Sequence, residues 1–426
     1  MRVIWVSMSI QFTTDAEIFD NRSALTNVYT PSTIISRYNQ IEEYVSQLTP
    51  AVNGSQPNNI FVYGKTGVGK TLCTQNVIRK ATRAAEEGGT QFTTFTINCD
   101  GISTDYQAAL KLDSTIRTQY FGVGKNDDVN GVKPARNGVP LPEVFDRLLS
   151  LIGEIGGVCI IVFDDVEKVS PNKFSDIIYQ LTRIGTETAS CDTSVGTILI
   201  SSEKDYLSNL PPDIQSSFGG HNIKFSPYTT RDLVNILHQR IETAFVDPDI
   251  VEHNVVVECA KIAANDGDAR RALELLRASG DVAVERGESE VTMDCLEVAK
   301  ERVLESVVEM YINTLTEQQK VIVYSTLIAV EEPNTQPRTK QIHNIYTKLV
   351  ERSDIKENGY RRTQQILNSL AENDIVEQAE YNGGQGNNAG KYYTYTFTYP
   401  HEIIVDVISD TIDKCGIHTC ISKYIE

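Results

Sequence analysis

Up to residue 228, short apolar runs alternate with stretches of helical periodicity. The run from Val158 to Phe163 is continuous and rich in β-branched residues, as a parallel strand covered on both faces requires. A helical stretch starts at Leu141 and ends at Gly153 or Gly156. Similar apolar runs predict five strands, at residues 59–63, 91–98, 158–165, 197–201 and 222–225. Strands separated by helices indicate an α/β domain with a parallel sheet.

Helical periodicity dominates from Thr229 to about Leu304, and a different pattern follows. A capping pair, Thr316 and Gln319, opens the next helix. The glycine-rich segment 382–390 would join two strands into a hairpin. The predicted elements are helices at 316–330, 339–352 and 359–373 and strands at 374–381 and 391–399. Helices followed by such a hairpin are typical of a winged helix, whose third helix enters the major groove of DNA.

These patterns predict three domains. An α/β domain with an N-terminal extension covers residues 1–228, a helical lid domain residues 229–310, and a winged-helix domain residues 311–426. The chain has 426 residues, 40% of them hydrophobic, which is enough apolar material for several cores. We therefore expect the protein to fold without disulfide or metal cross-links.

One stretch, Gly64–Thr71, fits the pattern G-x-x-x-x-G-K-[ST], which surrounds phosphates with successive backbone N–H groups. A predicted strand precedes it and a helix follows from Leu72 to Ile78, so the phosphates of ATP or ADP would lie at a helix N-terminus. In this pattern Lys70 reaches the outer phosphates and the Thr71 hydroxyl binds Mg²⁺. The predicted nucleotide-binding residues here are Gly64, Lys65, Thr66, Gly67, Val68, Gly69, Lys70, Thr71 and Leu72.

Two carboxylates, Asp164 and Asp165, stand at the end of the strand predicted at 158–165. Ligands of parallel sheets bind at the carboxyl ends of the strands, so both would lie beside the phosphate loop. We expect Asp164 to share Mg²⁺ with Thr71, and Asp165 to lie beside the water that attacks the nucleotide. An acidic turn after a core strand is the alternative interpretation.

Another helix opens at Gly267-Asp268-Ala269-Arg270, with Asp268 in the N-cap position. Arg270 then lies in the first turn, where a cation opposes the helix dipole and requires an anionic partner. A nucleotide phosphate is one candidate for that partner, and a surface carboxylate is the other.

The predicted winged helix contains a local excess of positive charge. Between Arg338 and Arg362 there are seven basic residues and three acidic ones, although residues 311–426 are otherwise net acidic. Arginine, glutamine and asparagine are the side chains that read base edges. The predicted DNA-binding residues are Lys356, Arg361, Arg362, Gln364, Gln365 and Asn368. A winged helix used only for protein contacts is the alternative.

The composition is acidic, with 39 Lys+Arg against 57 Asp+Glu and a net charge of −18. This balance argues against an indiscriminate nucleic-acid binder. It does not exclude sequence-specific DNA binding, because proteins adapted to high internal salt have acidic surfaces. In such salt the counterion-release contribution to affinity is nearly gone, and recognition depends on base contacts and DNA shape.

The cysteine pattern indicates a reducing compartment. None of the eight cysteines forms a C-x-x-C pair, and several lie in apolar runs, which predicts buried free thiols. Cys415, His418 and Cys420 lack the second ligand pair of a metal site. The first ten residues are too short and too weakly basic for a signal peptide, and no run is long enough to span a membrane. We expect a cytoplasmic protein with no membrane partner, translated from Met1 or Met8.

Several strings together resemble the archaeal initiators of DNA replication, AAA+ relatives of the origin recognition complex and of the helicase loader. Two of them are specific to that family, P-N-N-I-F-V-Y-G-K-T-G-V-G-K-T at 57–71 and G-D-A-R-R-A-L at 267–273. Further matches are Ile18-Phe19-Asp20, Tyr29-Thr30-Pro31, Phe225-Ser226-Pro227-Tyr228 and the winged helix. The Thr30-Pro31 string and the acidic composition are most similar to members from salt-loving archaea.

The resemblance implies an α/β fold of the AAA+ P-loop type: a five-stranded parallel sheet with a helical lid, followed by a C-terminal winged-helix domain. Tyr228 and Arg240 would line the lid side of the nucleotide, and Arg270 would be the second sensor that reads the γ-phosphate. The family's extra DNA-contacting helix would lie around residues 108–120, with Lys111 and Arg117 as its cations. The implied partners are double-stranded DNA at replication origins, a replicative helicase and other initiator paralogues.

The chain departs from the family pattern at positions that serve hydrolysis. Asp165 replaces a glutamate, which shortens the expected base by one methylene, and Ser202 replaces the asparagine of the first sensor. Asp213 stands where an arginine finger toward a neighbour's nucleotide is usual. The wing also lacks a common arginine. The resemblance therefore implies ATP binding with weak or absent hydrolysis, although Asp164, Asp165 and Ser202 remain the candidate catalytic residues.

Two functions fit these observations. One is an origin-specific initiator of DNA replication in which nucleotide acts mainly as a conformational switch. The other is a nucleotide-stabilised transcriptional or plasmid-maintenance regulator that binds DNA but loads no helicase. An origin repeat beside the gene would favour the first, and footprints over promoters would favour the second.

Overall fold

The computed structural model describes residues 18–184, 193–330, 336–351, 355–373, 375–382 and 391–414. The chain forms two compact units. The first contains residues 1–277 and 288–291, and the second contains residues 278–287 and 292–426. Each unit has its own buried apolar clusters, so each is described by itself.

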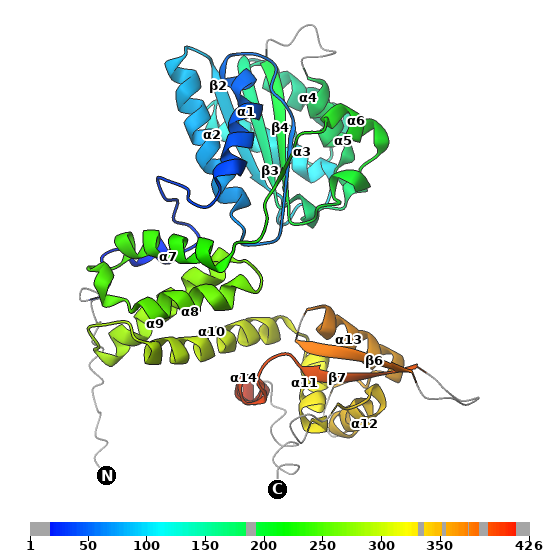
Figure 1. The fold of residues 1–426 in the computed structure, drawn as a ribbon. Helices are drawn as coiled ribbons and strands as arrows, with labels where there is room; N and C mark the ends of the chain where they lie inside the picture. Colours follow the sequence, from blue (N-terminus) through cyan, green and yellow to red (C-terminus); the bar gives the residue numbers. More distant parts are fainter. Residues whose placement is uncertain are drawn as a thin grey trace, which may run out of the picture. The chain divides into compact units, whose positions relative to one another are not determined.

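The first unit is built on a five-stranded parallel sheet, as predicted (Figure 1). The strands are β1 (Ile60–Tyr63), β2 (Phe92–Asn98), β3 (Gly157–Asp164), β4 (Thr193–Ser201) and β5 (Asn222–Lys224). Their order in the sheet is β2-β3-β4-β1-β5. This order places the end of β4 beside the end of β1, where the phosphate loop begins, and the end of β3 one strand further along the same edge.

Helices cover both faces of the sheet. On one face lie α1 (Tyr38–Val52) and α2 (Lys70–Glu87), and on the other lie α3 (Asp105–Gln119), α4 (Leu141–Gly153), α5 (Ser175–Arg183) and α6 (Pro212–Phe218). Alternate residues of β3 enter the two clusters: Ile160 and Val162 face α1 and α2, whereas Ile161 and Phe163 face the other helices. This double burial explains the unbroken apolar run in β3.

The lid helices of the first unit are α7 (Thr230–Ala244), α8 (His253–Ala264) and the first half of α9 (Ala269–Arg286), whose residues from 278 on belong to the second unit. Thr229 and Asp232 form a capping box that starts α7 after β5. The N-terminal segment packs on this lid through a bridge between Phe19 and Phe245. The start of the described chain is therefore fastened to the lid helices.

The second unit contains the predicted winged helix. Its elements are α10 (Met293–Thr314), α11 (Glu317–Ala329), α12 (Thr339–Val350), α13 (Tyr360–Glu372), β6 (Val376–Asn382), β7 (Lys391–Phe397) and α14 (His401–Lys414). The strands pair antiparallel from Val376 with Phe397 to Asn382 with Lys391. Thr316 and Gln319 form the predicted capping box of α11. Two features were not predicted: α14, and the continuity of α10 through residue 310.

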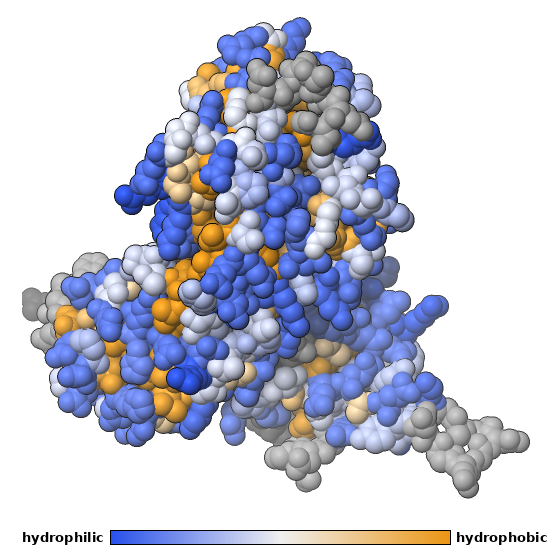
Figure 2. Space-filling model, turned by 45° about the horizontal axis from the view of Figure 1, so that its top comes forward, coloured by the Kyte–Doolittle hydropathy of each residue, from blue (hydrophilic) through white to orange (hydrophobic). Residues whose placement is uncertain are grey.

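The described surface agrees with the composition. Figure 2 shows a face on which hydrophilic side chains predominate. All five cysteines in the described ranges are buried, as their apolar surroundings predicted, whereas Cys191, Cys415, His418 and Cys420 lie outside those ranges. Among the described helices, none combines the length and the apolar character needed to cross a membrane.

Candidate functional site

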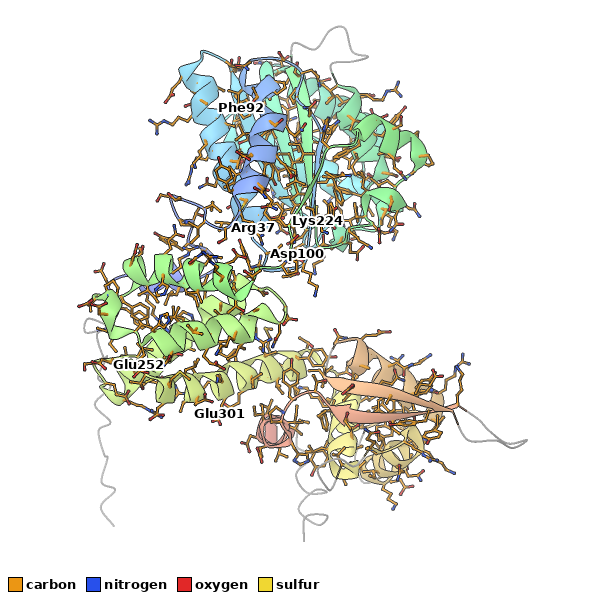
Figure 3. All side chains as sticks on the ribbon, viewed as in Figure 1. Arg37, Phe92, Asp100, Lys224, Glu252 and Glu301 are labelled. Carbon is orange, nitrogen blue, oxygen red and sulfur yellow. The ribbon has the colours of Figure 1, made fainter. Side chains whose placement is uncertain are left out.

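A cavity of about 430 Å³ lies at the carboxyl edge of the sheet in the first unit. In Figure 3, Phe92 marks the start of β2 at one end of the sheet, while Asp100, Lys224 and Arg37 lie at the other. The cavity walls come from the N-terminal segment, the phosphate loop, α7 and the start of α9. Its size is within the range of about 300–1,000 Å³ typical of small-molecule sites.

The phosphate loop ends in the first turn of α2, where N–H groups have no acceptor within the helix. Gly69 is the N-cap residue, in a left-handed conformation with φ of 88°. A Cβ added at Gly69 would lie 2.7 Å from the Tyr228 hydroxyl, and one added at Gly67 would lie within 1.8 Å of the Asp268 carboxylate. Both glycines have positive φ, 76° at Gly67 and 88° at Gly69, so a side chain at either position would strain the backbone.

Lys70 is held at the loop by two backbone carbonyls. Its ammonium donates hydrogen bonds to the Gly64 oxygen at 2.7 Å and the Lys65 oxygen at 2.9 Å. Burial lowers the pKa of Lys70, and the carboxylates of Glu167, Asp164 and Asp165 oppose that shift. A further anion such as a phosphate would be stabilised beside this partly desolvated cation.

Thr71 and Asp164, the predicted metal ligands, are in contact. The Thr71 hydroxyl donates to Asp164 Oδ1 at 3.1 Å. Burial raises the pKa of Asp164, and the charge of neighbouring Asp165 raises it further, so a cation would relieve both effects. A hydroxyl and a carboxylate are oxygen donors of the kind that Mg²⁺ prefers. These residues fit the predicted metal.

Asp165 lines the cavity and Ser202 follows the end of β4. Asp165 has φ of 57°, and its Oδ2 accepts a hydrogen bond from Asn98 Nδ2 at 3.4 Å. Ser202 is half-buried, and the strand that it follows, β4, lies between β1 and β3. Ser202 is not part of the cavity wall. The two candidate catalytic residues thus stand at adjacent strand ends.

Three residues predicted for the lid side, Tyr228, Arg240 and Arg270, line the cavity. Burial raises the pKa of Tyr228 to about 12. Arg240 is 4% exposed and donates from Nη1 to the Ala24 oxygen at 3.3 Å. Its Nε is buried and has no partner in the part of the chain that the structure describes. A buried donor without an acceptor costs about 1–3 kcal/mol, so a cavity-lining Arg240 favours an anionic ligand.

Arg270 is exposed at the cavity wall. Asp268 caps α9 as predicted, because its Oδ1 accepts from the backbone N–H of Arg270 at 2.7 Å. No carboxylate among the described residues pairs with the Arg270 guanidinium, and its charge lowers the pKa of Lys70. The surface carboxylate considered as its partner is therefore not found in the described ranges, and the phosphate interpretation remains.

The recognition surface of the winged helix is only partly as predicted. Arg361, Arg362 and Gln365 are exposed on α13, Gln364 is half-buried there, and Lys356 is exposed before that helix. The Asn368 side chain is hydrogen-bonded within the domain: its Oδ1 accepts from Gln378 Nε2 at 3.1 Å and from the Tyr395 hydroxyl at 3.4 Å. The side chains able to meet DNA thus lie on the N-terminal half of α13.

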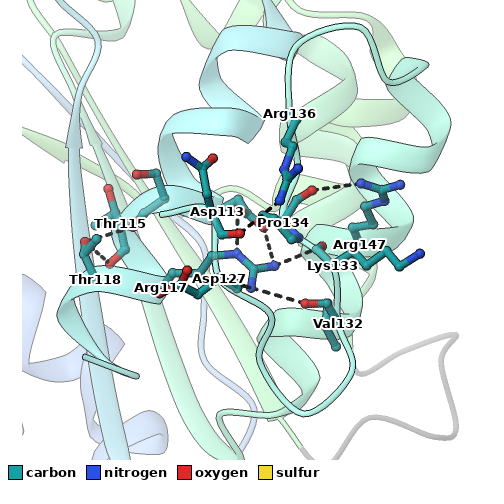
Figure 4. Close-up of polar contacts among 12 residues, drawn as sticks. Asp113, Thr115, Arg117, Thr118, Asp127, Val132, Lys133, Pro134, Arg136 and Arg147 are labelled. Atoms are coloured by element: carbon teal, nitrogen blue, oxygen red, sulfur yellow. Dashed lines mark hydrogen bonds and ion pairs between the residues drawn. The ribbon is translucent and has the colours of Figure 1, made fainter. Parts of the chain in front are cut away.

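The prediction that Arg117 contacts DNA is wrong. Its side chain is fully buried and makes hydrogen bonds with Asp113 and with the carbonyls of Asp127, Val132 and Lys133 (Figure 4). α3 packs against the sheet and supplies core residues, so it is not a projecting helix. Of the two cations predicted there, Lys111 alone is exposed.

Comparisons with known proteins agree with this architecture. Three family models match: an AAA ATPase domain over residues 33–189, a Cdc6 AAA+ ATPase-type lid domain over 234–301, and a CDC6 C-terminal winged-helix domain over 311–407. The ORC1-type DNA replication proteins 11 and 2 of Haloarcula marismortui are 31% and 32% identical over 417 and 421 residues. These alignments cover 97% and 98% of this chain, and the same shares of the two relatives.

The chain belongs to the family of ORC1-type DNA replication proteins. Its structure is also similar to that of the Aeropyrum pernix ORC1 protein in complex with DNA, with a TM-score of 0.76 and 27% identity over 93% of this chain and 97% of that one. The resemblance inferred from the motifs is thus confirmed, together with the AAA+ fold, lid and winged helix.

Sequence reasoning missed part of the site of this ORC1-type protein. Ile34 and Ile35 line the cavity, and they lie before α1, which starts at Tyr38. Leu72, Ile236 and Leu273 also line it, so part of the cavity wall is apolar. Their signal was weak, because isolated aliphatic residues before a helix are common in cores.

A further carboxylate, Glu167, was also missed. It lies in a short 3₁₀ turn, Val166–Lys168, directly after β3 and Asp165. Its Oε2 is buried and has no hydrogen-bond partner among the described residues. Among nearby carboxylates it acts most strongly on the pKa of Lys70. Its position two residues after Asp165 was the available sequence signal.

Proposed function

We propose that this ORC1-type protein is an ATP-binding, origin-specific DNA-binding initiator of replication in which nucleotide acts mainly as a conformational switch. One observation carries the nucleotide part: the phosphate loop, Asp165 and the cations Arg240 and Arg270 line the same cavity, and cavity-lining Thr71 contacts Asp164. The DNA part is supported by the exposed N-terminal half of α13 and by family membership.

In this proposal the nucleotide phosphates lie at the N-terminus of α2, within reach of the loop N–H groups and Lys70. Arg240 and Arg270 would approach from the lid, and the apolar wall with Ile35 and Leu273 would take the base. Thr71 and Asp164 would hold Mg²⁺, which neutralises phosphate charge when bound. Both the sheet domain and the lid would then contact one ligand.

The switch follows from that shared contact. The wall residues of α7 and α9 belong to the lid, whereas the phosphate loop belongs to the sheet domain. A ligand that bridges them favours the arrangement in which both sets of contacts are made. ATP and ADP differ at the γ-phosphate, which Arg270 would contact, so they should favour different lid positions.

Turnover should be slow. Asp165 is one methylene shorter than glutamate, Ser202 lies outside the cavity wall, and Asp213 is an exposed carboxylate on α6. Misplacement by about 1 Å can cost on the order of 100-fold in rate.

A helicase and other initiator paralogues are the proposed protein partners at the origin, as the family function implies.

The test is footprinting of the purified full chain on its own upstream intergenic DNA, in high KCl with Mg²⁺-ATP, while ATP turnover is followed. We expect protection of a discrete repeat with little turnover. Lys70→Ala should lose nucleotide binding and change the footprint, whereas Lys80→Ala, an exposed lysine of the same helix, should not.

Two results would count against the proposal. A Lys70→Ala footprint equal to that of the parent would show that nucleotide is not coupled to DNA binding. Protection over promoters, with none at a repeat, would favour the regulator described above.

A further inference from the structure

Arg37 is a buried arginine beside the phosphate loop that no sequence motif marked. It is the residue just before α1 and is 5% exposed. In Figure 3 it lies at the carboxyl end of the sheet, near Lys224. Burying a guanidinium is costly unless it is hydrogen-bonded, so its contacts indicate what it does.

The guanidinium of Arg37 joins two segments that are distant in sequence. Its Nε donates to the Val68 carbonyl at 3.0 Å, and its Nη2 donates to the Ser226 carbonyl at 2.8 Å. Val68 belongs to the phosphate loop, and Ser226 to the connection between β5 and α7. Both acceptors are neutral backbone groups, and the charge of Arg37 also acts on the carboxylate of Asp232 in α7.

The bond to Val68 fixes the direction of a neighbouring donor. A trans peptide is planar and its C=O and N–H point in opposite directions. Because the Val68 carbonyl is turned toward Arg37, the Gly69 N–H of the same peptide is turned away from it. Gly69 lines the cavity and caps α2, where N–H groups bind phosphate.

The second contact of Arg37 is with the lid connection. Its guanidinium lies 3.6 Å from the ring centroid of Tyr228, at a distance typical of a cation–π pair. The Tyr228 N–H donates to the Gly267 carbonyl at 3.2 Å, directly before α9. The Tyr228 hydroxyl also approaches Gly69, since a Cβ added there would lie 2.7 Å from it. Arg37 therefore links the loop, through Tyr228, to the helix that carries Arg270.

The positive charge of Arg37 acts on a residue in the first turn of α2, Cys73. Burial raises the pKa of the Cys73 thiol to about 12, and the positive charge of Arg37 opposes that rise. The same charge lowers the energy of any anion bound at the loop. The charge of Arg37 and its bond to the Val68 carbonyl therefore both favour binding of an anion at the phosphate loop.

We propose that Arg37 is a positioning residue for the nucleotide: it orients the Gly69 N–H toward the phosphates and couples the phosphate loop to the lid through Tyr228. This inference rests on the nucleotide binding proposed above. It adds a residue outside the phosphate-loop motif, and a physical connection between loop and lid.

Nucleotide affinity of full-length variants, measured calorimetrically for ATP and ADP, tests the proposal. Arg37→Met should weaken the affinities for ATP and for ADP by about 10- to 100-fold. This range is expected when one hydrogen bond to a charged group and one nearby cation are lost. Arg37→Lys, which keeps the charge but cannot reach both carbonyls and stack, should lie between parent and Arg37→Met.

Leu48→Ala separates positioning from general destabilisation. Leu48 is a buried residue of α1, eleven positions after Arg37, in the cluster formed with α2. It should lower the melting temperature without changing the affinity of the folded protein. If Leu48→Ala weakens binding as much as Arg37→Met does, or if Arg37→Met binds like the parent, the inference is wrong.

The coupling to Tyr228 is tested by a double-mutant cycle. Arg37→Met and Tyr228→Leu together should weaken binding by less than the product of their separate effects, because they act through one contact. Multiplicative effects would refute the coupling. If Arg37→Met does not fold, an unchanged affinity of Arg37→Lys refutes the proposal. A parent that binds neither ATP nor ADP refutes the proposed function itself, a result distinct from any variant effect.

Discussion

At the scale of residues, the candidate site contains the phosphate-loop residues that the motif predicts, whereas Asp165 departs from the pattern that the family resemblance implies. Lys70, Thr71 and Asp164 make the contacts expected of a phosphate and metal site. Asp165, in contrast, has a left-handed backbone, which aspartate tolerates better than most residues, and its carboxylate is within reach of Asn98. The effect of side-chain length at position 165 on ATP turnover can therefore be tested.

Asp165→Glu should raise ATP turnover by about 10- to 100-fold, because one methylene moves the carboxylate by about 1 Å toward the expected water. Phosphate release under single-turnover conditions measures the change, with exposed Asp205→Glu as the control. Glu167 is the competing group. If Asp165→Glu has no effect while Glu167→Gln abolishes the residual turnover, Glu167 and not residue 165 orients the water.

At the scale of elements, the sequence pattern predicted the regular helices and strands. It missed features that depend on the contacts of single residues. β3 was found because it is apolar on both faces, and α11 because Thr316 and Gln319 form a capping box. The location of Ile35 in the cavity wall depends on an irregular segment, which has no period. The family resemblance assigns Arg117 to DNA contact, and no local pattern tells a buried arginine from an exposed one.

The same ion-pair spacing has opposite consequences in α3 and α2. Arg117–Asp113, at 2.9 Å, is fully buried, whereas Arg83–Glu87, at 3.0 Å, is mostly exposed. Arg117→Met should cost about 3–5 kcal/mol, because it leaves a buried carboxylate without its partner. Arg83→Met should cost at most about 1 kcal/mol.

Chemical denaturation of the two variants measures the difference, and DNA affinity of the folded fraction should be unchanged in both. Asp113→Leu added to Arg117→Met should recover part of the loss, since it removes the buried charge. A DNA-binding defect in folded Arg117→Met would restore the original assignment of Arg117.

α3 also starts with a buried carboxylate, Asp105, which accepts from the Ile177 N–H at 2.8 Å. Burial raises its pKa from 3.8 to about 6. The folded state then holds this proton more tightly, so stability falls as pH rises from about 4 to 6 and the loss is complete above about 6. The upper limit of that loss is about 3 kcal/mol.

Asp105→Asn keeps the acceptor and removes the charge. It should therefore raise the melting temperature at pH 7 and leave it nearly unchanged at pH 4. Exposed Asp146→Asn, in α4, is the matched control and should show no such pH dependence. An equal gain at both pH values would mean that the Asp105 charge is not the cause.

At the scale of the whole molecule, the net charge of −18 opposes the approach of DNA, and the cations of α13 act only locally. In molar salt the Debye length is about 3 Å, so the general repulsion is screened while direct contacts persist. An acidic initiator can therefore bind DNA through short-range base contacts where a basic protein would lose its counterion-release term. Salt dependence distinguishes these two sources of affinity.

We expect a shallow slope of log affinity against log KCl on the protected repeat. Arg362→Ala should weaken binding by about 10- to 100-fold if it reads a base edge, without changing the slope, whereas loss of a phosphate contact would reduce the slope by about 0.9. Arg231→Ala changes the net charge equally but lies in the lid. Fluorescence anisotropy at several KCl concentrations measures all three proteins. If Arg231→Ala and Arg362→Ala weaken binding equally, total charge and not the α13 surface governs recognition.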